Sequence, residues 1–186
     1  MVQGLLNLAR RDDLTLSPGD LHAVIEASAT SVRNAKLPAS VTLTTSLAAQ
    51  PSQVLMDADQ MQQVLVNLIS NAVQAMPAAG GSVRVATAVV PVPQDAPRTG
   101  RRAALFRPGD HTLVAEVADT GTGSSEGHLA KIWEPFFTTK PRGQGTGLGL
   151  AIVRSIVEHH HGFIDVTSVV GQGTTFRITL PLPPRA

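Results

Sequence analysis

The residues best suited to chemistry in this chain lie on one predicted helix, from about Asp57 to Met76. One face of this helix repeats apolar residues at spacings of three and four, as a helix does where it packs on a core. The opposite face carries a row of amide side chains: Gln60, Gln63, Asn67, Asn71 and Gln74. A solvated helix face ordinarily carries Lys and Glu, whereas this helix has no charged residue after Asp59.

Asn67 and Asn71 stand four residues apart and can direct their amide oxygens at a common point. Such oxygens suit a hard cation such as magnesium, which shares phosphate oxygens and keeps several waters. The pattern therefore indicates a cation site, and a polar helix face without a function is the alternative.

Asp119 ends a predicted apolar strand that begins at Thr112, and the chain then turns through Gly121 and Gly123. A carboxylate at the end of a strand can accept a hydrogen bond from an exocyclic amine. Glycine also lets the backbone approach a flat ring closely. An ordinary turn at the end of a strand is the alternative.

The run Gly145-Thr146-Gly147-Leu148-Gly149 leads directly into a helix predicted from about Thr146 to His160. Backbone amides at a helix N-terminus form an anion site where no side chain shields them. The run lacks the dinucleotide pattern, because position 150 is Leu, and the phosphate-loop pattern, because no lysine follows a glycine. Lys140 precedes the run by five residues and can reach a terminal phosphate. A glycine-rich hinge is the alternative.

The composition of the chain narrows the classes of function. A length of 186 residues fits one globular domain, and a formal net charge of +1 gives no electrostatic reason to expect a nucleic-acid partner. No apolar run reaches transmembrane length, and no signal segment opens the chain. The absence of cysteine excludes disulfides and thiolate sites and fits a cytoplasmic location, with no membrane contact by this domain.

Helices and strands are mixed along the chain without strict alternation. Residues 1–35 are predicted to be helical, with Ser17 as an N-cap and Pro18 in the first turn. Val54-Leu55 adds a short edge, a short helix lies near Glu126–Trp133, and residues 91–110 form a loop. The predicted strands are Val41–Leu47, Val83–Val90, Thr112–Asp119, Phe163–Val169 and Thr174–Leu180. We expect an α+β fold, an α/β sandwich whose mixed, mostly antiparallel sheet has helices layered on one face.

In chain order, the segments NLISNAVQAM, DTGTG, EPFFTTK, GTGLGLAIV and GQGTTF resemble the five sequence boxes of one family. That family is the catalytic, ATP-binding domain of bacterial two-component sensor histidine kinases, within the gyrase, chaperone, histidine kinase and mismatch-repair ATPase superfamily. The resemblance covers about residues 41–182. It implies ATP and Mg²⁺ as cofactors, bound between the polar helix and a mobile lid.

The resemblance also implies residue roles. Asn71 would coordinate the magnesium ion beside Asn67, and Asp119 would bind the adenine amino group at a wall shaped by Gly121 and Gly123. Thr174 would lie beneath the base. The nucleotide-binding run would comprise Gly145, Thr146, Gly147, Leu148 and Gly149, with its glycines donating amides to the phosphates.

Lys140 would be a mobile cationic contact, and Phe136 and Phe137 would anchor the lid. Gln74 stands where many members of the family have a lysine, so that one phosphate contact is neutral here. Ser124 and Gly127 also depart from the pattern and indicate a looser lid.

One position separates a kinase from an ATPase. Hydrolytic relatives place a glutamate base four residues before the magnesium asparagine, where this chain has Asn67, which cannot accept a proton at neutral pH. The resemblance then implies transfer of the γ-phosphoryl group to a histidine on a dimerisation domain, followed by relay to a response regulator. No histidine of this chain has the sequence context of that acceptor.

We therefore expect residues 1–35 to be a remnant of the dimerisation-domain helix and its connector, and residues 36–186 to be the catalytic domain. The isolated chain is expected to be monomeric and the full protein a homodimer. The alternatives are a non-catalytic nucleotide-sensing or docking module and a free-standing serine kinase or ATPase.

Two further groups have ordinary interpretations. Adjacent histidines His159-His160-His161 point in different directions on a helix, so cations at a helix end are favoured over a metal site. Arg98, Arg101, Arg102 and Arg107 are expected to lie on a solvated loop, with a partner contact as the alternative.

Overall fold

The computed structural model describes residues 15–35, 37–92, 106–140 and 145–182. The strands are β1 Ser17–Asp20, β2 Val41–Leu47, β3 Gln53–Met56, β4 Gly81–Pro91, β5 His111–Asp119, β6 Phe163–Val169 and β7 Gly173–Pro181. The helices are α2 Leu21–Asn34, α3 Ala58–Gln74, α5 Glu126–Leu129 and α6 Gly149–His159.

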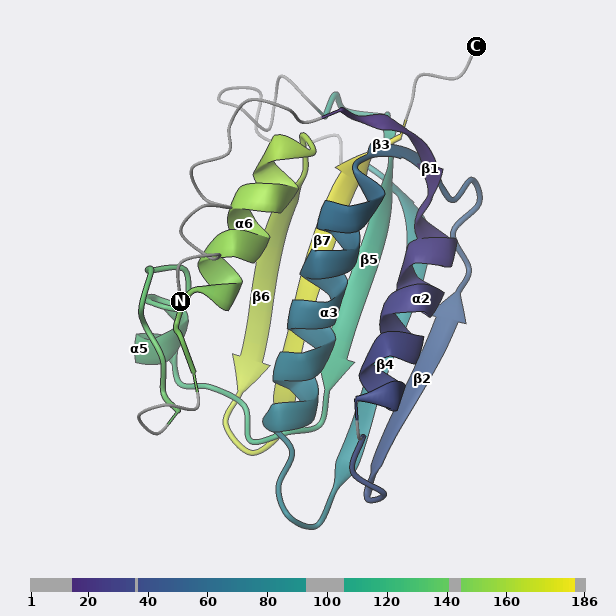
Figure 1. Ribbon diagram of the computed structural model, residues 1–186. Coiled ribbons are helices and arrows are strands. Elements are labelled where there is room, and N and C mark those ends of the chain that lie inside the picture. Colours follow the sequence, from purple (N-terminus) through teal and green to yellow (C-terminus); the bar gives the residue numbers. More distant parts are fainter. Residues whose placement is uncertain (1–14, 36, 93–105, 141–144, 183–186) are drawn as a thin grey trace.

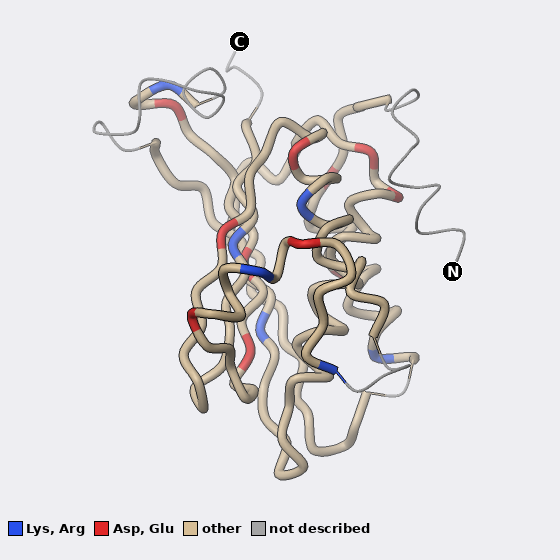
Figure 2. The backbone as a smooth tube through the Cα atoms, turned by 90° about the vertical axis from the view of Figure 1, so that its left-hand side faces the viewer, with Lys and Arg blue, Asp and Glu red and all other residues tan. Residues whose placement is uncertain are grey.

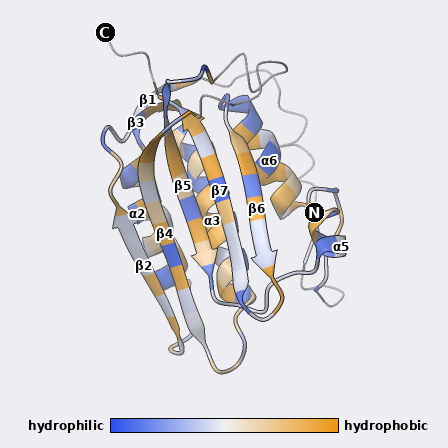
Figure 3. Cartoon of the chain, turned by 180° about the vertical axis from the view of Figure 1, so that it is seen from behind, coloured by the Kyte–Doolittle hydropathy of each residue, from blue (hydrophilic) through white to orange (hydrophobic). Residues whose placement is uncertain are grey.

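Five strands form the main sheet in the order β2-β4-β5-β7-β6. β2 pairs parallel with β4, and the other three pairings are antiparallel. Helices α2, α3 and α6 lie side by side over one face of this sheet (Figure 1), and the view from behind shows the other face without a covering helix (Figure 3). The expected α/β sandwich with a mixed, mostly antiparallel sheet is confirmed.

Helix α3 occupies the middle of the helical layer and carries most of the core. Its apolar stripe is fully buried at Met61, Val64, Leu65, Leu68 and Ile69. The stripe packs against β4 and β5 below and against α2 and α6 on either side. Burial of each such side chain contributes roughly 1.5–3 kcal/mol, so the direction of the amide stripe is fixed by the packing of the apolar one.

The N-terminal part of the prediction is wrong at Ser17, which caps no helix. Residues Ser17–Asp20 form strand β1, which pairs antiparallel with β3 in a separate two-stranded sheet. Asp20 caps α2 instead, because its carboxylate accepts a hydrogen bond from the His22 backbone N–H at 2.9 Å. The short edge predicted at Val54-Leu55 is β3, and its partner is β1 rather than the main sheet.

Helix α2 shares the core of the domain. Leu21, Ile25 and Ala29 are almost fully buried, and α2 packs directly on α3. The described part of residues 1–35 therefore packs as one unit with the rest. Residues 1–14 lie outside the described part, so the expected remnant of another domain stays a prediction.

The interpretation of the three histidines as cations at a helix end is wrong for His160, which is buried. The backbone N–H of Asp57, the N-cap of α3, donates to His160 Nε2 at 3.0 Å. Because Nε2 accepts, Nδ1 carries the proton and donates to the Ile156 carbonyl at 2.8 Å. Burial lowers the pKa of His160 from its usual 6.5, so the ring is held neutral.

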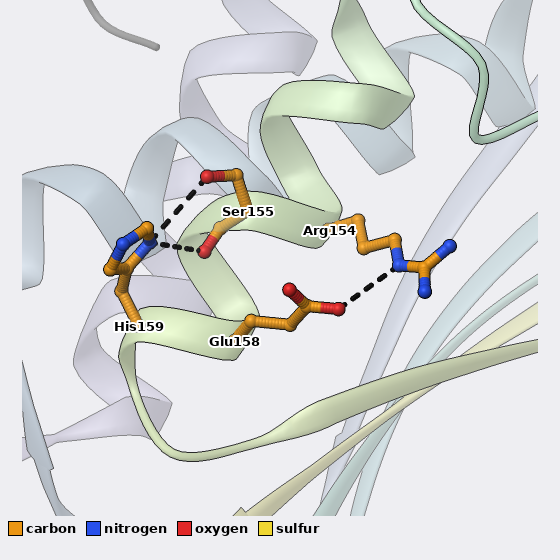
Figure 4. Close-up of polar contacts among 4 residues, drawn as sticks. All are labelled: Arg154, Ser155, Glu158 and His159. Atoms are coloured by element: carbon orange, nitrogen blue, oxygen red, sulfur yellow. Dashed lines mark hydrogen bonds and ion pairs between the residues drawn. The ribbon is translucent and has the colours of Figure 1, made fainter. Parts of the chain in front are cut away.

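The exposed side of α6 behaves as expected for a solvated helix (Figure 4). Arg154 pairs with Glu158 one turn later at 3.0 Å, and His159 Nδ1 lies 2.6 Å from the Ser155 carbonyl near the C-terminus of the helix. Among the described residues, no group of three or more His, Cys, Asp or Glu is arranged to hold a metal ion.

In the view of Figure 2, charged residues are few, and basic and acidic ones are interspersed along the backbone. On the open sheet face, Arg177 of β7 pairs with Glu116 of β5 at 2.6 Å. Phe106 and Phe163 meet edge to face there, with ring centroids 5.1 Å apart. Of the four arginines expected on a loop, only Arg107 lies in the described part. No described helix is both long and apolar enough to cross a membrane.

We predict that the His160 contact makes folding sensitive to acid. Because the folded-state pKa is lowered, the unfolded chain binds this proton more readily, so the contribution is intact above pH 6.5 and is lost as the pH falls below it. The slope should be at most about 1.4 kcal/mol per pH unit. Asp57 and His159 are the charged groups that act on the ring. Chemical denaturation at several pH values between about 5 and 8, the range in which histidine changes charge, measures the effect.

In this series His160→Gln should be less stable than the wild type at neutral pH and should show a flatter dependence on pH. His111→Gln, at an exposed position at the start of β5, is the matched control and should follow the wild type. An unchanged slope in His160→Gln would contradict the assignment.

Candidate functional site

A cavity of about 500 Å³ lies between the amide face of α3 and the segments after β5. This volume is within the usual range for small-molecule sites. Most of the predicted site residues line it: Asn67, Asn71, Gln74, Asp119, Gly123, Lys140, Gly145, Thr146, Gly147, Gly149 and Thr174. Gly121 and Leu148 do not line it.

The end of α3 is tied directly to the turn that follows β5. The Thr122 backbone N–H donates to the Ala75 carbonyl at the C-cap of α3, at 3.0 Å. A Cβ placed on Gly121 would lie 2.6 Å from that same carbonyl oxygen. Gly121 therefore acts by letting the turn approach the helix, and this approach fixes the spacing between Asp119 and the amide stripe.

Asp119 is almost fully buried at the end of β5, and its two carboxylate oxygens differ. Oδ1 accepts from the backbone N–H groups of Gly121 at 2.8 Å and Thr174 at 3.2 Å. No described residue donates a hydrogen bond to Oδ2. Burial raises the pKa of this carboxyl above its usual 3.8, against the opposing effect of the two N–H donors. The side chain is thus oriented by one oxygen, and the other has no donor among the described residues.

Gly173 lets the start of β7 approach the end of β5 beside the cavity. Its φ is +115°, and an added Cβ would lie 1.9 Å from the Asp119 carbonyl oxygen. Thr174, the next residue, donates to Asp119 and shares a hydrogen bond with Ser168 at 2.9 Å. The start of β7 therefore requires glycine so that Thr174 can approach the carboxylate.

The glycine run joins the cavity to the N-terminus of α6. Leu148 precedes the helix, makes no side-chain capping bond and is buried in the core, which anchors the run. The first N–H groups of a helix have no intrahelical partner, so here they remain available to an anion. Gly147 has a φ of +66°, and its carbonyl accepts from the Phe136 N–H at 2.9 Å.

The two phenylalanines expected to anchor the lid differ in environment. Phe137 lines the cavity, whereas Phe136 is 65% exposed. Phe136 has a φ of +69°, and an added Cβ on Gly147 would lie 2.3 Å from its carbonyl carbon. Phe136 is therefore attached through its backbone and not through its ring.

Lys140 reaches across the cavity to α3. Its ammonium donates to Asn71 Oδ1 at 3.2 Å and to Gln74 Oε1. Partial burial lowers the pKa of Lys140. Asn71 Oδ1 therefore faces the cavity as an acceptor, and an amide oxygen is a donor type that suits magnesium, so the expected role as magnesium ligand stays a prediction.

Asn67 lies one turn before Asn71 and faces the start of α6. A Cβ placed on Gly149 would lie 3.9 Å from Asn67 Oδ1, which is ordinary contact. Asn67 thus adjoins the part of the cavity formed by the start of α6, and its amide is not a base.

Sequence reasoning missed the carbonyl of Ala75 and the apolar lining of the cavity. That lining includes Ala72, Leu129, Ile132, Val166 and Phe176. His128 also lines the cavity, with its ring 6.0 Å from that of Phe137. The spacing of Ala72 assigns it to the buried apolar face of α3, and no local pattern marks Val166 or Phe176, so the sequence gives no signal for this lining.

Comparison with known proteins agrees with this geometry. Residues 56–184 match the family described as histidine kinase-, DNA gyrase B-, and HSP90-like ATPases. The sensor kinase CckA of Brucella abortus is 48% identical over 125 residues, which are 67% of this chain and 13% of that protein. The sensor histidine kinase ZraS of Klebsiella oxytoca is 36% identical over 184 residues, 98% of this chain and 35% of that protein.

The histidine-protein kinase AtoS of Escherichia coli is 32% identical over 185 residues, 100% of this chain and 27% of that protein. This chain therefore spans between 13% and 35% of the length of these three relatives. Among solved structures, the mycobacterial sensor histidine kinase MprB aligns with a TM-score of 0.67 at 25% identity, over 89% of this chain and 97% of that one. Full-length ShkA in complex with AMPPNP aligns with a TM-score of 0.74 at 25% identity, over 97% of this chain and 35% of that one.

We predict that the wall formed by Gly173 tolerates no side chain. Gly173→Ala should lower the free energy of unfolding by at least about 3 kcal/mol, because its Cβ meets a backbone carbonyl. Gly171→Ala is the matched control in the same turn: its φ is +79°, but an added Cβ there meets nothing. The control should lose only about 1–2 kcal/mol. Equal losses in thermal or chemical unfolding would contradict the close approach of β7 to Asp119.

Proposed function

Because this chain belongs to the family of histidine kinase-, DNA gyrase B- and HSP90-like ATPases, we propose that its cavity binds ATP with magnesium for phosphoryl transfer to a histidine. Within that family its relatives are sensor histidine kinases, and it corresponds to their ATP-binding catalytic domain. The activity and partners of the whole protein are part of the proposal.

A single observation carries the proposal: the same cavity holds a carboxylate oxygen that would accept from an amine and a helix N-terminus that would face an anion. The carboxylate oxygen is Asp119 Oδ2, and the helix is α6. Asn71 of α3 lines this cavity as well. An adenine nucleotide carries an exocyclic amine and a polyphosphate at its two ends, so its chemistry matches both.

At the adenine end, Asp119 would accept from the exocyclic amine while Gly121 and Thr174 hold the carboxylate in place. Gly123 lies at the same wall, and the apolar lining gives the base a surface to pack on. ShkA was solved in complex with AMPPNP, an ATP analogue, which supports a nucleotide at the corresponding place in this chain.

At the phosphate end, the amides of Gly145, Gly147 and Gly149 would face the phosphates, whereas the Leu148 N–H donates to Thr146 Oγ1 at 3.3 Å. Asn71 Oδ1 would be the protein ligand of magnesium, which when bound neutralises phosphate charge. Lys140 would supply a second cationic contact. What these residues provide is positioning and charge neutralisation, which are the main requirements of phosphoryl transfer.

Asn67 supports a kinase over an ATPase. A hydrolytic enzyme needs a base that takes a proton from water, and an amide cannot do so. The γ-phosphoryl group would then be kept for a better nucleophile, a histidine imidazole on a dimerisation and phosphoacceptor domain. Relay to a response regulator, a homodimeric full protein and a cytoplasmic site of action complete the proposal.

Isothermal titration calorimetry with a non-hydrolysable ATP analogue and magnesium tests the proposal. Measurable, magnesium-dependent binding is expected. If no binding is detected at millimolar nucleotide, the proposed function is ruled out.

We predict that Asp119→Asn loses about 10- to 100-fold in affinity for adenine nucleotides, because an acceptor of a charge-assisted hydrogen bond becomes a donor facing the amine. The fold should persist, since Asn retains an oxygen for Gly121 and Thr174. Because burial raises the pKa of Asp119, wild-type affinity should also fall on acidification, starting above the pH at which an ordinary aspartate titrates. Unchanged affinity in the variant would place the adenine elsewhere.

We also predict that Asn67→Glu raises the rate of ATP hydrolysis. A carboxylate there could act as a general base for water, a role that typically contributes about 100- to 10,000-fold. Even a tenfold gain in phosphate release would be diagnostic, and Asn67→Gln, which adds length without a base, should show none. Equal rates in the two variants would argue against this position as the switch between kinase and hydrolase.

A further inference from the structure

Two amide oxygens on α3 contact the same ammonium. Lys140 Nζ donates to Asn71 Oδ1 at 3.2 Å and to Gln74 Oε1, and these residues are three apart and therefore on one helix face. Asn71 is the magnesium ligand in the proposed function. Its oxygen is thus a point that two different cations can occupy.

The neighbours of Lys140 leave room for this contact. The Lys140 backbone N–H donates to Thr138 Oγ1 at 3.1 Å. A Cβ placed on Gly145 would lie 2.8 Å from Thr138 Oγ1 and 3.2 Å from Lys140 Cδ. A side chain at position 145 would therefore collide with Thr138 Oγ1 and crowd the lysine stem, so the absence of a side chain there leaves room for Lys140.

The ammonium is held without charge compensation. Both acceptors are neutral amides, and among the described residues no salt bridge joins Lys140 to a carboxylate. A partly buried ammonium gains more from an ionised oxygen than from an amide. The contact to α3 is therefore one that a phosphate can outcompete.

Resting on the proposed function, we propose that Gln74 is a positioning residue that holds Lys140 over Asn71, so that Lys140 and magnesium compete for the Asn71 oxygen. Lys140 must leave that oxygen before it can bind another cation, and Gln74 sets how readily the lysine leaves. A cation at position 74 would repel Lys140, and a carboxylate would retain it through charge. An amide holds the lysine and still releases it to an anion.

The contact itself can be tested without nucleotide, by NMR of the side-chain amide groups. Lys140→Ala should shift the NH₂ resonances of both Asn71 and Gln74. Lys131→Ala, which removes a lysine from an exposed position outside the cavity, should shift neither. The absence of a shift at Gln74 in the first variant would overturn the inference.

The competition can be tested by stopped-flow binding of a fluorescent ADP analogue with magnesium. Gln74→Ala should associate faster and bind ADP about 2- to 10-fold more tightly, the effect of losing one hydrogen bond from the competing state. Lys140→Ala should also bind ADP more tightly. It should improve ATP binding less, because the variant loses the contact that Lys140 would make with the terminal phosphate. Gln74→Asn should lie between the wild type and Gln74→Ala.

The double variant decides the mechanism. If Gln74 acts through Lys140, then Gln74→Ala should have no further effect in the Lys140→Ala background. If Gln74→Ala instead weakens ADP binding equally in both backgrounds, Gln74 contacts the nucleotide directly and the inference is overturned. A wild-type protein that binds no nucleotide would remove the proposed function, while the NMR comparison would still decide whether Gln74 holds Lys140.

Discussion

Helix α3 is held at both ends by hydrogen bonds from segments far away in the sequence, and the site depends on this. At its N-terminus the Asp57 N–H donates to His160, and at its C-terminus the Ala75 carbonyl accepts from Thr122. The buried stripe between these ends fixes the rotation of the helix. Since successive residues of a helix are about 100° apart, a slip of one residue would change the direction in which the Asn71 side chain points. The position of Asn71, the proposed magnesium ligand, is thus a result of core packing.

The same arrangement leaves several polar groups only partly satisfied. Asp119 uses one oxygen on two backbone N–H groups, and the amides at the start of α6 have no capping side chain. Within the described ranges, Lys140 is paired only with neutral oxygens. Groups with unused hydrogen-bonding capacity at fixed positions lower the reorganisation needed on binding. In the proposed function, a negative group at one end and positive groups at the other also fix the direction in which a nucleotide lies.

The elements that rest on local periodicity could be predicted from the sequence. The apolar stripe of α3, the cap at Asp57 and the five strands of the main sheet follow from patterns within each segment. Strand β1 could not be predicted in this way, because its extended form depends on pairing Ser17 with Met56. The burial of His160 among three adjacent histidines depends equally on a contact with the start of α3. At the site, the candidate side chains could be identified from the sequence. The contact of Thr122 with the Ala75 carbonyl and the contact of Lys140 with Gln74 could not, because each joins segments that are distant in the sequence.

The use of amides along α3 has a consequence for the order of binding in the proposed function. A single neutral oxygen binds magnesium weakly, because the ion gives up its water reluctantly and prefers charged ligands. Asn71 alone would therefore gain the ion only together with phosphate oxygens. A carboxylate at position 71 would bind the free ion better, but it would repel the phosphates, and at position 67 it would supply a base for water. In the proposed function the neutral amides therefore make magnesium binding depend on nucleotide binding. They also place no base beside the γ-phosphoryl group, so that ATP is not hydrolysed before the acceptor histidine binds.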